Sequence, residues 1–312
     1  MILVYILLLV LGLVMLFIGG DWLVKGASRF SLRLGISVMV VGLTVVAFGT
    51  SAPEFIVSLL ASIRKEGSVA IGNIVGSNIA NIALVLGVSA LIKPIKIQTI
   101  TLRQDVPWML AAAFLFLIVT FMGKMGRMWG AAFLILFSFF LYGCFRKKRD
   151  VELPVKETSG TLTRDVLLIV AGLALLLAGG EVVVSNAVAL AKMMKVSELI
   201  IAATIVALGT SLPELMTSLV ASLKGEQDIA VGNVIGSNIF NILWVLGFCA
   251  LITPFDLQSK QLGFHNLVMI IFSLLCLPIM HTGKTISRTE GLFMVFGYIL
   301  YIVLLYAFSV SF

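Results

Sequence analysis

Apolar runs of about the length that crosses a bilayer recur along nearly the whole of this 312-residue chain, with only short polar breaks between them. A membrane-spanning helix needs about 20 predominantly apolar residues. The composition agrees, because 60% of the residues are hydrophobic, 12% are charged and the mean hydropathy is +1.15. Soluble globular domains do not show such values. The chain therefore belongs in a lipid bilayer, and no soluble domain fits between the runs.

The runs and breaks predict an all-α membrane protein with ten transmembrane helices. Pro53 and Pro213 stand inside the second and seventh helices and are expected to break them. The N-terminus enters the first run without a basic leader or a cleavage site, so this helix is expected to be retained. The ten expected ranges are 2–24, 37–63, 69–92, 105–122, 127–145, 165–189, 197–222, 229–252, 264–281 and 288–310.

Basic residues are distributed unevenly between the two sets of alternating connecting segments. One set holds 15 of the 22 Lys and Arg residues, including the RKKRD run at 146–150. Positive charge marks the cytoplasmic side, so the chain is expected in the plasma (inner) membrane with both termini on the outer face and the 146–164 linker in the cytoplasm. The net charge of +7 thus reflects topology and does not indicate nucleic-acid binding.

The two halves of the chain repeat each other. Residues 44–87 align without a gap onto 204–247 at a constant offset of 160, and 25 of the 44 positions are identical. We therefore divide the chain into a first repeat at 1–145, the linker at 146–164 and a second repeat at 165–312. Each repeat holds five expected helices, an odd number, so the second enters the membrane from the opposite side. Inverted repeats with broken helices are typical of secondary transporters.

The first repeated block places one carboxylate in each half at mid-membrane depth. It reads TVVAFGTSAPE up to Glu54 and TIVALGTSLPE up to Glu214. A charged side chain at the bilayer centre costs several kcal/mol, so an intramembrane acid indicates function. Pro53 and Pro213 have no amide hydrogen, which leaves backbone carbonyls one turn earlier, around 47–50 and 207–210, available as cation ligands.

The second repeated block supplies amides and hydroxyls. It reads GNIVGSNIAN at 72–81 and GNVIGSNIFN at 232–241. Asn73, Ser77 and Asn81 fall at i, i+4 and i+8 and share one helix face, while the glycines allow close helix approach.

All of these groups are hard oxygen donors, which suit Ca²⁺ or Na⁺, and none is a His or Cys suited to a softer metal. Two ionised glutamates about 5 Å apart at an effective dielectric of about 20 repel each other by roughly 3 kcal/mol. One Ca²⁺, several Na⁺ or shared protons would neutralise them, which is a physical basis for exchange at one site.

The paired GTSAPE/GTSLPE and GNxxGSNxxN blocks resemble the two α-repeats of the cation/calcium antiporter superfamily, in its prokaryotic sodium/calcium exchanger branch. The resemblance covers both halves. It implies a secondary active antiporter that exchanges three Na⁺ for one Ca²⁺ by alternating access, with no cofactor and no required partner protein. It also implies a transport site made of Glu54, Glu214, Thr50, Thr210, Ser51, Ser211, Asn81, Asn241, Ser77, Ser237, Ala47 and Ala207.

The Asn residues at both 81 and 241 depart from relatives that carry an aspartate at one of these positions. This departure argues against K⁺ dependence and weakens the inference on stoichiometry. A Ca²⁺/H⁺ antiporter of the same superfamily stays open as an alternative, because close glutamates can share a proton. A passive Ca²⁺ channel is a further alternative. An enzyme is not expected, since no nucleophile–base pair or HExxH-like motif is present.

Several other residues are expected to be structural. Asp21 and Glu181 form a second symmetric acidic pair, at helix ends, and are interpreted as ion-pair partners. His265 and His281 are expected at membrane boundaries, and Trp244 in packing. The three cysteines, Cys144, Cys249 and Cys276, have no paired spacing and are interpreted as core residues.

Overall fold

The computed structural model describes residues 2–146, 160–196, 205, 207–257 and 260–310. Within these residues, eight helices are long and apolar enough to cross a membrane, and a bent pair of helices forms a ninth candidate span. The seventh expected helix, at 197–222, lies partly outside the described residues. Large apolar side chains such as Phe17 are exposed along the outer helices, as a lipid-facing surface requires.

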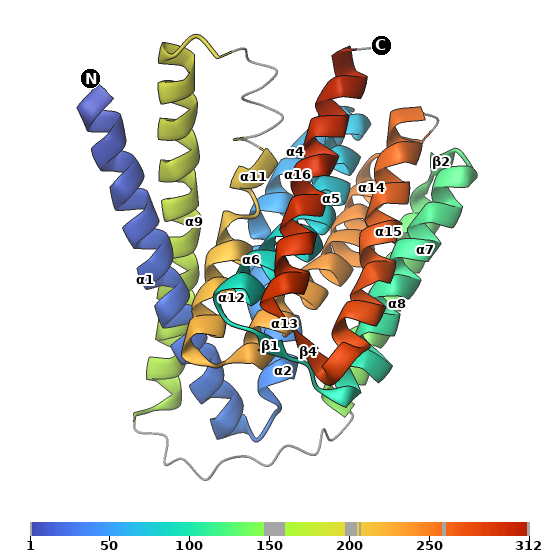
Figure 1. The fold of residues 1–312 in the computed structure, drawn as a ribbon. Helices are drawn as coiled ribbons and strands as arrows, with labels where there is room; N and C mark the ends of the chain where they lie inside the picture. Colours follow the sequence, from blue (N-terminus) through green and yellow to red (C-terminus); the bar gives the residue numbers. More distant parts are fainter. Residues whose placement is uncertain (1, 147–159, 197–204, 206, 258–259, 311–312) are drawn as a thin grey trace.

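Two long helices, α1 (Ile2–Leu34) and α9 (Leu162–Met193), lie side by side and run in opposite directions (Figure 1). Glycines permit this contact, since a Cβ atom on Gly19 would lie 2.8 Å from the carbonyl oxygen of Gly172. Both helices are longer than expected. In α1 the helix continues past Asp21 and Lys25, charged residues near which it was expected to end. It ends at Leu34, directly before Gly35, whose φ of +63° is readily adopted by glycine.

The second apolar segment is built from α2 (Val38–Val41), the π-helical η1 (Gly42–Val46), α3 (Ala47–Thr50) and α4 (Ala52–Ile63). It bends by 47° between Thr50 and Ala52, which confirms the break expected beside Pro53. The described part of its counterpart is interrupted at the equivalent place, between α11 (Ala207–Gly209) and α12 (Leu212–Lys224).

Two continuous helical segments form the centre of the molecule. One joins α5 (Gly67–Ala80), the π-helical η2 (Asn81–Leu86) and α6 (Gly87–Ile92). The other joins α13 (Gln227–Ile239), the π-helical η5 (Phe240–Leu246) and α14 (Gly247–Ile252). In the apolar window of each segment 78% of the residues are buried, against 17% for α1. The GNxxGSN motif at 232–238 is buried throughout. The motif at 72–78 is exposed at Gly72 and half-buried at Asn73 and Gly76, and α1 lies at the periphery.

The remaining helices surround this centre on the side away from α1 and α9 (Figure 1). They are η3 (Thr101–Asp105, π-helical), α7 (Val106–Phe121), α8 (Arg127–Arg146), α15 (Lys260–His281), the 3₁₀ turn η6 (Thr282–Lys284) and α16 (Arg288–Val310).

Two short antiparallel strand pairs tie the halves together. In one pair β1 (Ile95–Lys96) lies on β4 (Thr285–Ile286), with Ile95 opposite Ile286. In the other pair β2 (Lys124–Met125) lies on β3 (Phe255–Asp256), with Met125 opposite Phe255. The pairs lie at opposite ends of the molecule (Figure 1). Each strand pair joins a strand of one half to a strand of the other half.

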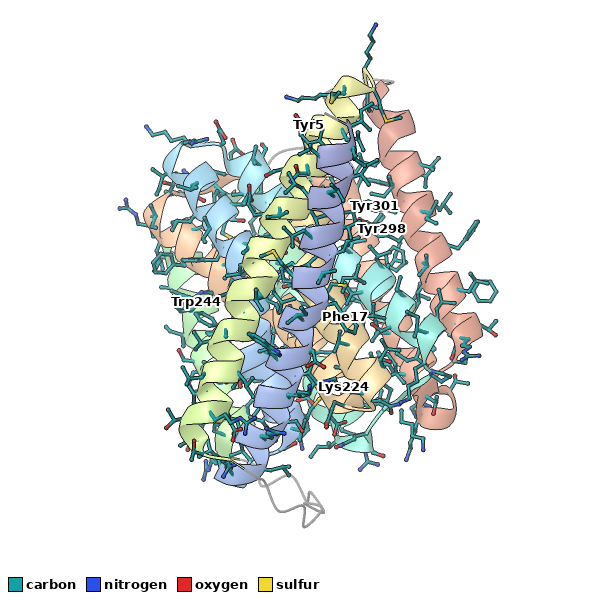
Figure 2. All side chains as sticks on the ribbon, turned by 90° about the vertical axis from the view of Figure 1, so that its left-hand side faces the viewer. Tyr5, Phe17, Lys224, Trp244, Tyr298 and Tyr301 are labelled. Atoms are coloured by element: carbon teal, nitrogen blue, oxygen red, sulfur yellow. The ribbon has the colours of Figure 1, made fainter. Side chains whose placement is uncertain are left out.

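The beginning of α1 and the end of α16 lie at the same end of the molecule, which we call the terminal face (Figure 1). The end of α8 and the beginning of α9 lie at the opposite end, the linker face. Figure 2 shows Tyr5 near the terminal face, Phe17 at mid-height and Lys224 nearer the linker face.

The minor structural predictions are confirmed in most cases. All three cysteines are buried, and none of them forms a disulfide within the described residues. Trp244 packs among Phe55, Phe137 and Phe248, at ring-centroid distances of 6.3, 5.6 and 5.8 Å. Asp21 forms ion pairs with Lys25, at 2.7 Å, and with Lys224. His265 lies near the beginning of α15, where its ring contacts Tyr301 on α16 and lines a cavity, and its place at a membrane boundary stays a prediction.

Candidate cation-binding site

The helix breaks bring the two glutamates into the centre of the protein. Pro53 and Pro213 are each the second residue of the helix that follows the break, and Glu54 and Glu214 come next. Both glutamate side chains are fully buried. The carbonyl of Gly49 cannot accept the usual helical hydrogen bond, because Pro53 has no amide hydrogen to donate. The break thus removes the usual helical donor of one backbone oxygen in the turn before each glutamate.

Each glutamate accepts one hydroxyl from its own half and one from the other half. Glu54 Oε1 accepts from Ser77 at 3.2 Å and from Ser211 at 3.4 Å. The second half repeats this arrangement, because Oε1 of Glu214 accepts from Ser51 at 3.1 Å and from Ser237 at 3.5 Å. The crossed contacts of Ser51 and Ser211 bring the two glutamates into one shared site.

Several buried oxygens around the glutamates have no hydrogen-bond donor among the described residues. They include Oε2 of Glu54 and of Glu214 and Oδ1 of Asn81 and of Asn241. Leaving one buried acceptor unpaired costs about 1–3 kcal/mol, and more when it is charged. Four unpaired acceptors, two from each half, are therefore unfavourable in the buried interior unless cations or protons bind to them. These unpaired oxygens are the observation by which the residues of the site fit a hard cation.

An amide frame orients the asparagine oxygens. Asn81 donates its amide to Asn238 Oδ1 at 3.1 Å, and Asn241 donates to Asn78 Oδ1 at 3.0 Å. Asn78 and Asn238 donate in turn to each other's backbone carbonyls, at 3.3 and 3.4 Å. These bonds orient the side-chain amides of Asn81 and Asn241, whose Oδ1 atoms accept no hydrogen bond within the described residues.

Sequence reasoning missed Asn78 and Asn238 as site residues. The available signal was their identity at the 160-residue offset inside the GSN motif. They lie one position off the helical stripe of Asn73, Ser77 and Asn81 and off its counterpart in the second half. Only the packing of α5 against α13 shows that they hold the asparagine oxygens in place.

Asn73 and Asn233 hold the glutamate-bearing helices in position. Asn73 donates to the carbonyl of Glu54 at 3.2 Å and to the hydroxyl of Ser58 at 2.9 Å. Asn233 makes the same pair of bonds in the second half, at 3.3 and 3.0 Å. Asn73 and Asn233, which belong to the helix faces predicted to supply oxygens, therefore also donate from their amide nitrogens. These bonds fix the backbone on both sides of the site.

The two site threonines differ. Thr50 donates to Asn233 Oδ1 at 2.9 Å and lies 3.4 Å from the hydroxyl of Ser237. Thr210 lies beside Glu54, but its hydroxyl is buried and outside good hydrogen-bond geometry. The halves are thus alike in composition and unlike in detailed contacts at this point.

The two alanines contribute backbone to the site. Ala47 is buried, and its carbonyl accepts from the Ser51 amide at 3.0 Å and from the Thr50 hydroxyl at 3.3 Å. Ala207 begins α11, and its side-chain surroundings lie outside the described residues. Among the described residues, no three His, Cys, Asp or Glu side chains gather as a soft-metal centre would require.

Both halves of the chain match a known protein family. The model of the family described as "Sodium/calcium exchanger protein" matches residues 4–146 and 165–307. The chain is 34% identical over 348 residues to the sodium/calcium exchanger MaX1 of Methanosarcina acetivorans, covering 98% of this chain and 99% of that protein. It is 39% identical over 314 residues to the inner membrane protein YrbG of Escherichia coli, covering 96% of each.

Solved structures agree with the sequence comparisons. A structure of the sodium-calcium exchanger NCX_Mj without Na⁺ and Ca²⁺ superimposes with a TM-score of 0.85 at 32% sequence identity. The superposition covers 98% of this chain and 100% of the other. With its apolar helices, its duplicated motifs and these matches over both halves, the chain belongs to the sodium/calcium exchanger family of integral membrane proteins.

Proposed function

We propose that this protein is a secondary active antiporter that moves Ca²⁺ and Na⁺ in opposite directions through the shared glutamate site. One observation carries this proposal: two buried glutamates, one from each half, each have an unpaired Oε2, and crossed serine hydrogen bonds join them in one site. Carboxylate and amide oxygens are the ligands of hard cations. The names of the relatives, sodium/calcium exchangers, support the choice of ions.

The proposed transport site is the full set inferred from the sequence. The glutamates supply charge, the serines and asparagines supply neutral oxygens, and the residues around the breaks supply carbonyls. Its members are Glu54, Glu214, Thr50, Thr210, Ser51, Ser211, Asn81, Asn241, Ser77, Ser237, Ala47 and Ala207. Asn78 and Asn238 act as positioning residues for the asparagine oxygens.

Charge balance makes the ions competitors. Two ionised carboxylates are neutralised by one Ca²⁺ or by two Na⁺, so the same oxygens can serve either ion but not both at once. We propose three Na⁺ for each Ca²⁺, so that each cycle moves one net positive charge.

We propose an architecture of ten spans in two inverted repeats of five, with residues 1–145 and 165–312 as the repeats and 146–164 as a linker. The two matched ranges of the family model support this division. The opposite directions of α1 and α9, and the strand pairs that join the halves at opposite ends, support the inversion (Figure 1).

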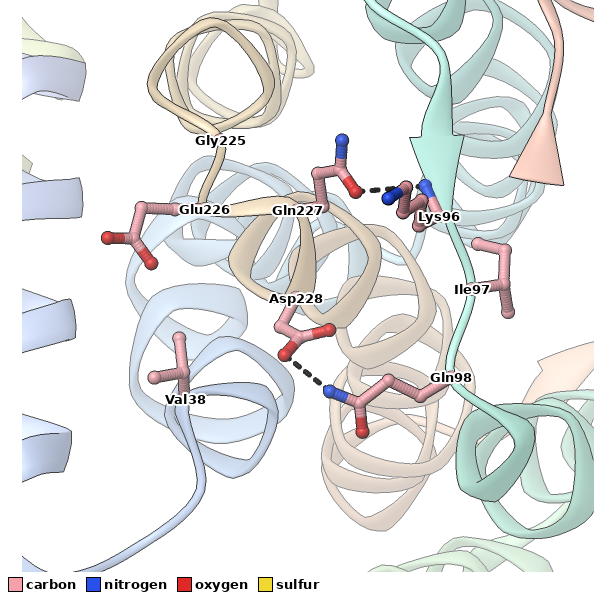
Figure 3. Close-up of a pocket in the computed structure, with 8 residues that line it drawn as sticks. All are labelled: Val38, Lys96, Ile97, Gln98, Gly225, Glu226, Gln227 and Asp228. Atoms are coloured by element: carbon pink, nitrogen blue, oxygen red, sulfur yellow. Dashed lines mark hydrogen bonds between the residues drawn. The ribbon is translucent and has the colours of Figure 1, made fainter. Parts of the chain in front are cut away.

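The linker face of the site is closed in this conformation. A Cβ atom on Gly236 would lie 2.5 Å from the carbonyl oxygen of Leu43, so the two segments are in close contact there. Farther out, Gln98 donates to Asp228 at 2.6 Å, and Gln227 accepts from the amide of Lys96 at 3.0 Å (Figure 3). These contacts lie beside a pocket of about 260 Å³ that includes none of the proposed ion ligands.

The terminal face is open by comparison. A Cβ atom on Gly76, the counterpart of Gly236, would meet no atom within 4 Å among the described residues. Alternating access predicts that in each end state the ion site is closed toward one face and open toward the other. The unequal packing of the two faces agrees with one such end state. From the distribution of basic residues, we propose that the terminal face is the outer face of the inner membrane and that the linker is cytoplasmic.

The function is tested with purified protein in liposomes. An outward or inward Na⁺ gradient at constant pH should drive Ca²⁺ in the opposite direction and produce a membrane current, because each cycle moves net charge. Ca²⁺ movement driven by a pH gradient alone would contradict Na⁺ coupling and favour the Ca²⁺/H⁺ antiporter, which two close buried carboxylates could also support. Downhill Ca²⁺ flux that needs no counter-ion would identify a channel.

A further inference from the structure

The side-chain amides of Asn78 and Asn238 have a second hydrogen-bond acceptor besides the backbone of the asparagine frame. Each amide has two N–H groups. One is used on the backbone carbonyl of the other asparagine, at 3.3 and 3.4 Å. The second acceptor is a methionine sulfur, because Asn238 Nδ2 lies 3.6 Å from Sδ of Met109 and Asn78 Nδ2 lies 3.8 Å from Sδ of Met269. The sulfurs therefore complete the donor capacity of both amides.

These acceptors fix which way each amide faces. A backbone carbonyl and a thioether sulfur carry no hydrogen to donate, so the nitrogen of each amide has to face them. The oxygen is thereby turned the other way, where Asn78 Oδ1 accepts from Asn241 at 3.0 Å and Asn238 Oδ1 accepts from Asn81 at 3.1 Å. The sulfurs thus stand at the outer end of the bonds that orient the asparagine oxygens of the site.

Both sulfurs come from helices outside the centre of the molecule. Met109 lies on α7, which packs against α13, and Met269 lies on α15, which packs against α5 (Figure 1). Met109 is 2% exposed and Met269 is 0% exposed, and Asn78 and Asn238 are each 1% exposed. A buried N–H group without a partner is costly. A thioether is a weak acceptor, and here it is the acceptor that the packing brings to the second N–H group.

The internal repeat preserves the two methionines while most of their surroundings differ. Residues 106–121 and 266–281 correspond at the offset of 160, and only three of these 16 positions are identical. One of the three is Met109 with Met269. Packing alone therefore does not keep residue types fixed along these helices, because the other positions changed freely. The methionine recurs together with the asparagine to which its sulfur is bonded.

We propose that Met109 and Met269 are positioning residues of the cation site, whose sulfurs hold the amides that orient Asn81 and Asn241. The proposal rests on the proposed transport function, since it concerns the same site. The sulfurs are too soft to be ligands of the cation and act through the amides. Each acts by a route that crosses between the halves: Met109 through Asn238 on Asn81, and Met269 through Asn78 on Asn241.

The consequence is a loss of affinity when a sulfur is removed. Without its second acceptor, the amide turns toward other groups in the ion-free protein. Binding of a cation then has to restore the amide before the asparagine oxygen can take part. The dissociation constant for the cation rises, while the apolar packing of α7 and α15 is kept.

The first test removes each sulfur with little change in side-chain volume. Met109→Leu and Met269→Leu should each raise the Kd for Ca²⁺ by roughly threefold to tenfold, the range of one hydrogen bond, in calorimetric titration of the purified protein. Met280→Leu is the matched control, because Met280 is buried on α15 and its sulfur accepts from neither asparagine within the described residues. An unchanged Kd, or an equal change in the control, would overturn the proposal.

The second test follows the route of each sulfur. In an Asn81→Ala background, Met109→Leu should raise the Kd no further, whereas Met269→Leu should keep its full effect. In an Asn241→Ala background the two methionines should exchange these roles. A methionine that serves only packing would give additive effects in both backgrounds, and that result would refute the positioning role.

The third test changes the sulfur atom without changing the shape of the side chain. Norleucine has a methylene group in place of the sulfur, so protein produced with norleucine at its 13 methionine positions should show the raised Kd of the Met109→Leu/Met269→Leu variant. Selenomethionine protein should bind Ca²⁺ as the native protein does. A native Kd in the norleucine protein would contradict the proposal even if the leucine variants fail to fold. Failure of the proposed function would differ from all of these results, because the native protein itself would then bind no Ca²⁺.

Discussion

Replacing Glu54 by glutamine should abolish Ca²⁺ binding while leaving the ion-free protein as stable as the native one. The substitution keeps the shape of the side chain and removes one charge. Its oxygen can still accept from Ser77 and Ser211, which now bond to Glu54 Oε1 at 3.2 and 3.4 Å. The new NH₂ group takes the position of Oε2, which has no donor among the described residues and is proposed to face the ion.

The magnitude follows from the charges. A divalent ion and one carboxylate about 4 Å apart attract by about 8 kcal/mol at an effective dielectric of about 20, before the cost of desolvation. Even a third of that gross attraction corresponds to roughly a hundredfold loss of affinity. In the ion-free state the change also removes the repulsion between Glu54 and Glu214, which offsets the weaker serine–amide hydrogen bonds of about 1 kcal/mol each.

The assay is thermal unfolding of purified protein with and without Ca²⁺, paired with Ca²⁺ uptake into liposomes. Saturating ligand at about 100 times Kd stabilises the native protein by about 2.7 kcal/mol, so its Tm should rise with Ca²⁺. The Glu54→Gln variant should lose this rise, keep a native-like Tm without Ca²⁺ and show no uptake. Glu66→Gln, at an exposed position, is the control. A retained Ca²⁺-dependent rise, or a large fall in Tm without Ca²⁺, would refute the reasoning.

Two further predictions concern the packing of α1 against α9. Gly19→Ala should lower Tm by several degrees, because its Cβ would lie 2.8 Å from backbone atoms of α9 and overpacking costs about 1–3 kcal/mol; Gly143→Ala, with open space around it, should leave Tm unchanged. Arg33→Met should cost about 3–5 kcal/mol in unfolding free energy, because it strands the buried Asp165 to which Arg33 bonds at 2.5 Å. Lys25→Met, which removes an exposed ion-pair partner, should cost less than about 1 kcal/mol, and equal effects of the two changes would contradict the burial argument.

Most of the helices could be predicted because each apolar run has to satisfy its own backbone in the bilayer. The prolines at 53 and 213 likewise predicted the breaks, since a missing amide hydrogen is a covalent property of the residue. The C-terminal end of α1 was missed, because Asp21 and Lys25 were interpreted as marks of a helix end, whereas α1 continues past them and Asp21 pairs with both Lys25 and Lys224. That pairing depends on α12, which is distant in the sequence.

The membrane environment, the duplication and the two glutamates follow from the amino-acid order, because hydropathy, internal identity and an acid in an apolar run are local properties of the chain. Which oxygens stay unpaired depends on the tertiary packing. Ser51 and Ser211 cross to the opposite glutamate, and Asn78 and Asn238 occupy the amide nitrogens of Asn241 and Asn81. The unequal packing of Gly76 and Gly236, identical in the repeat, is also tertiary, since only the contacts of neighbouring segments distinguish the two faces.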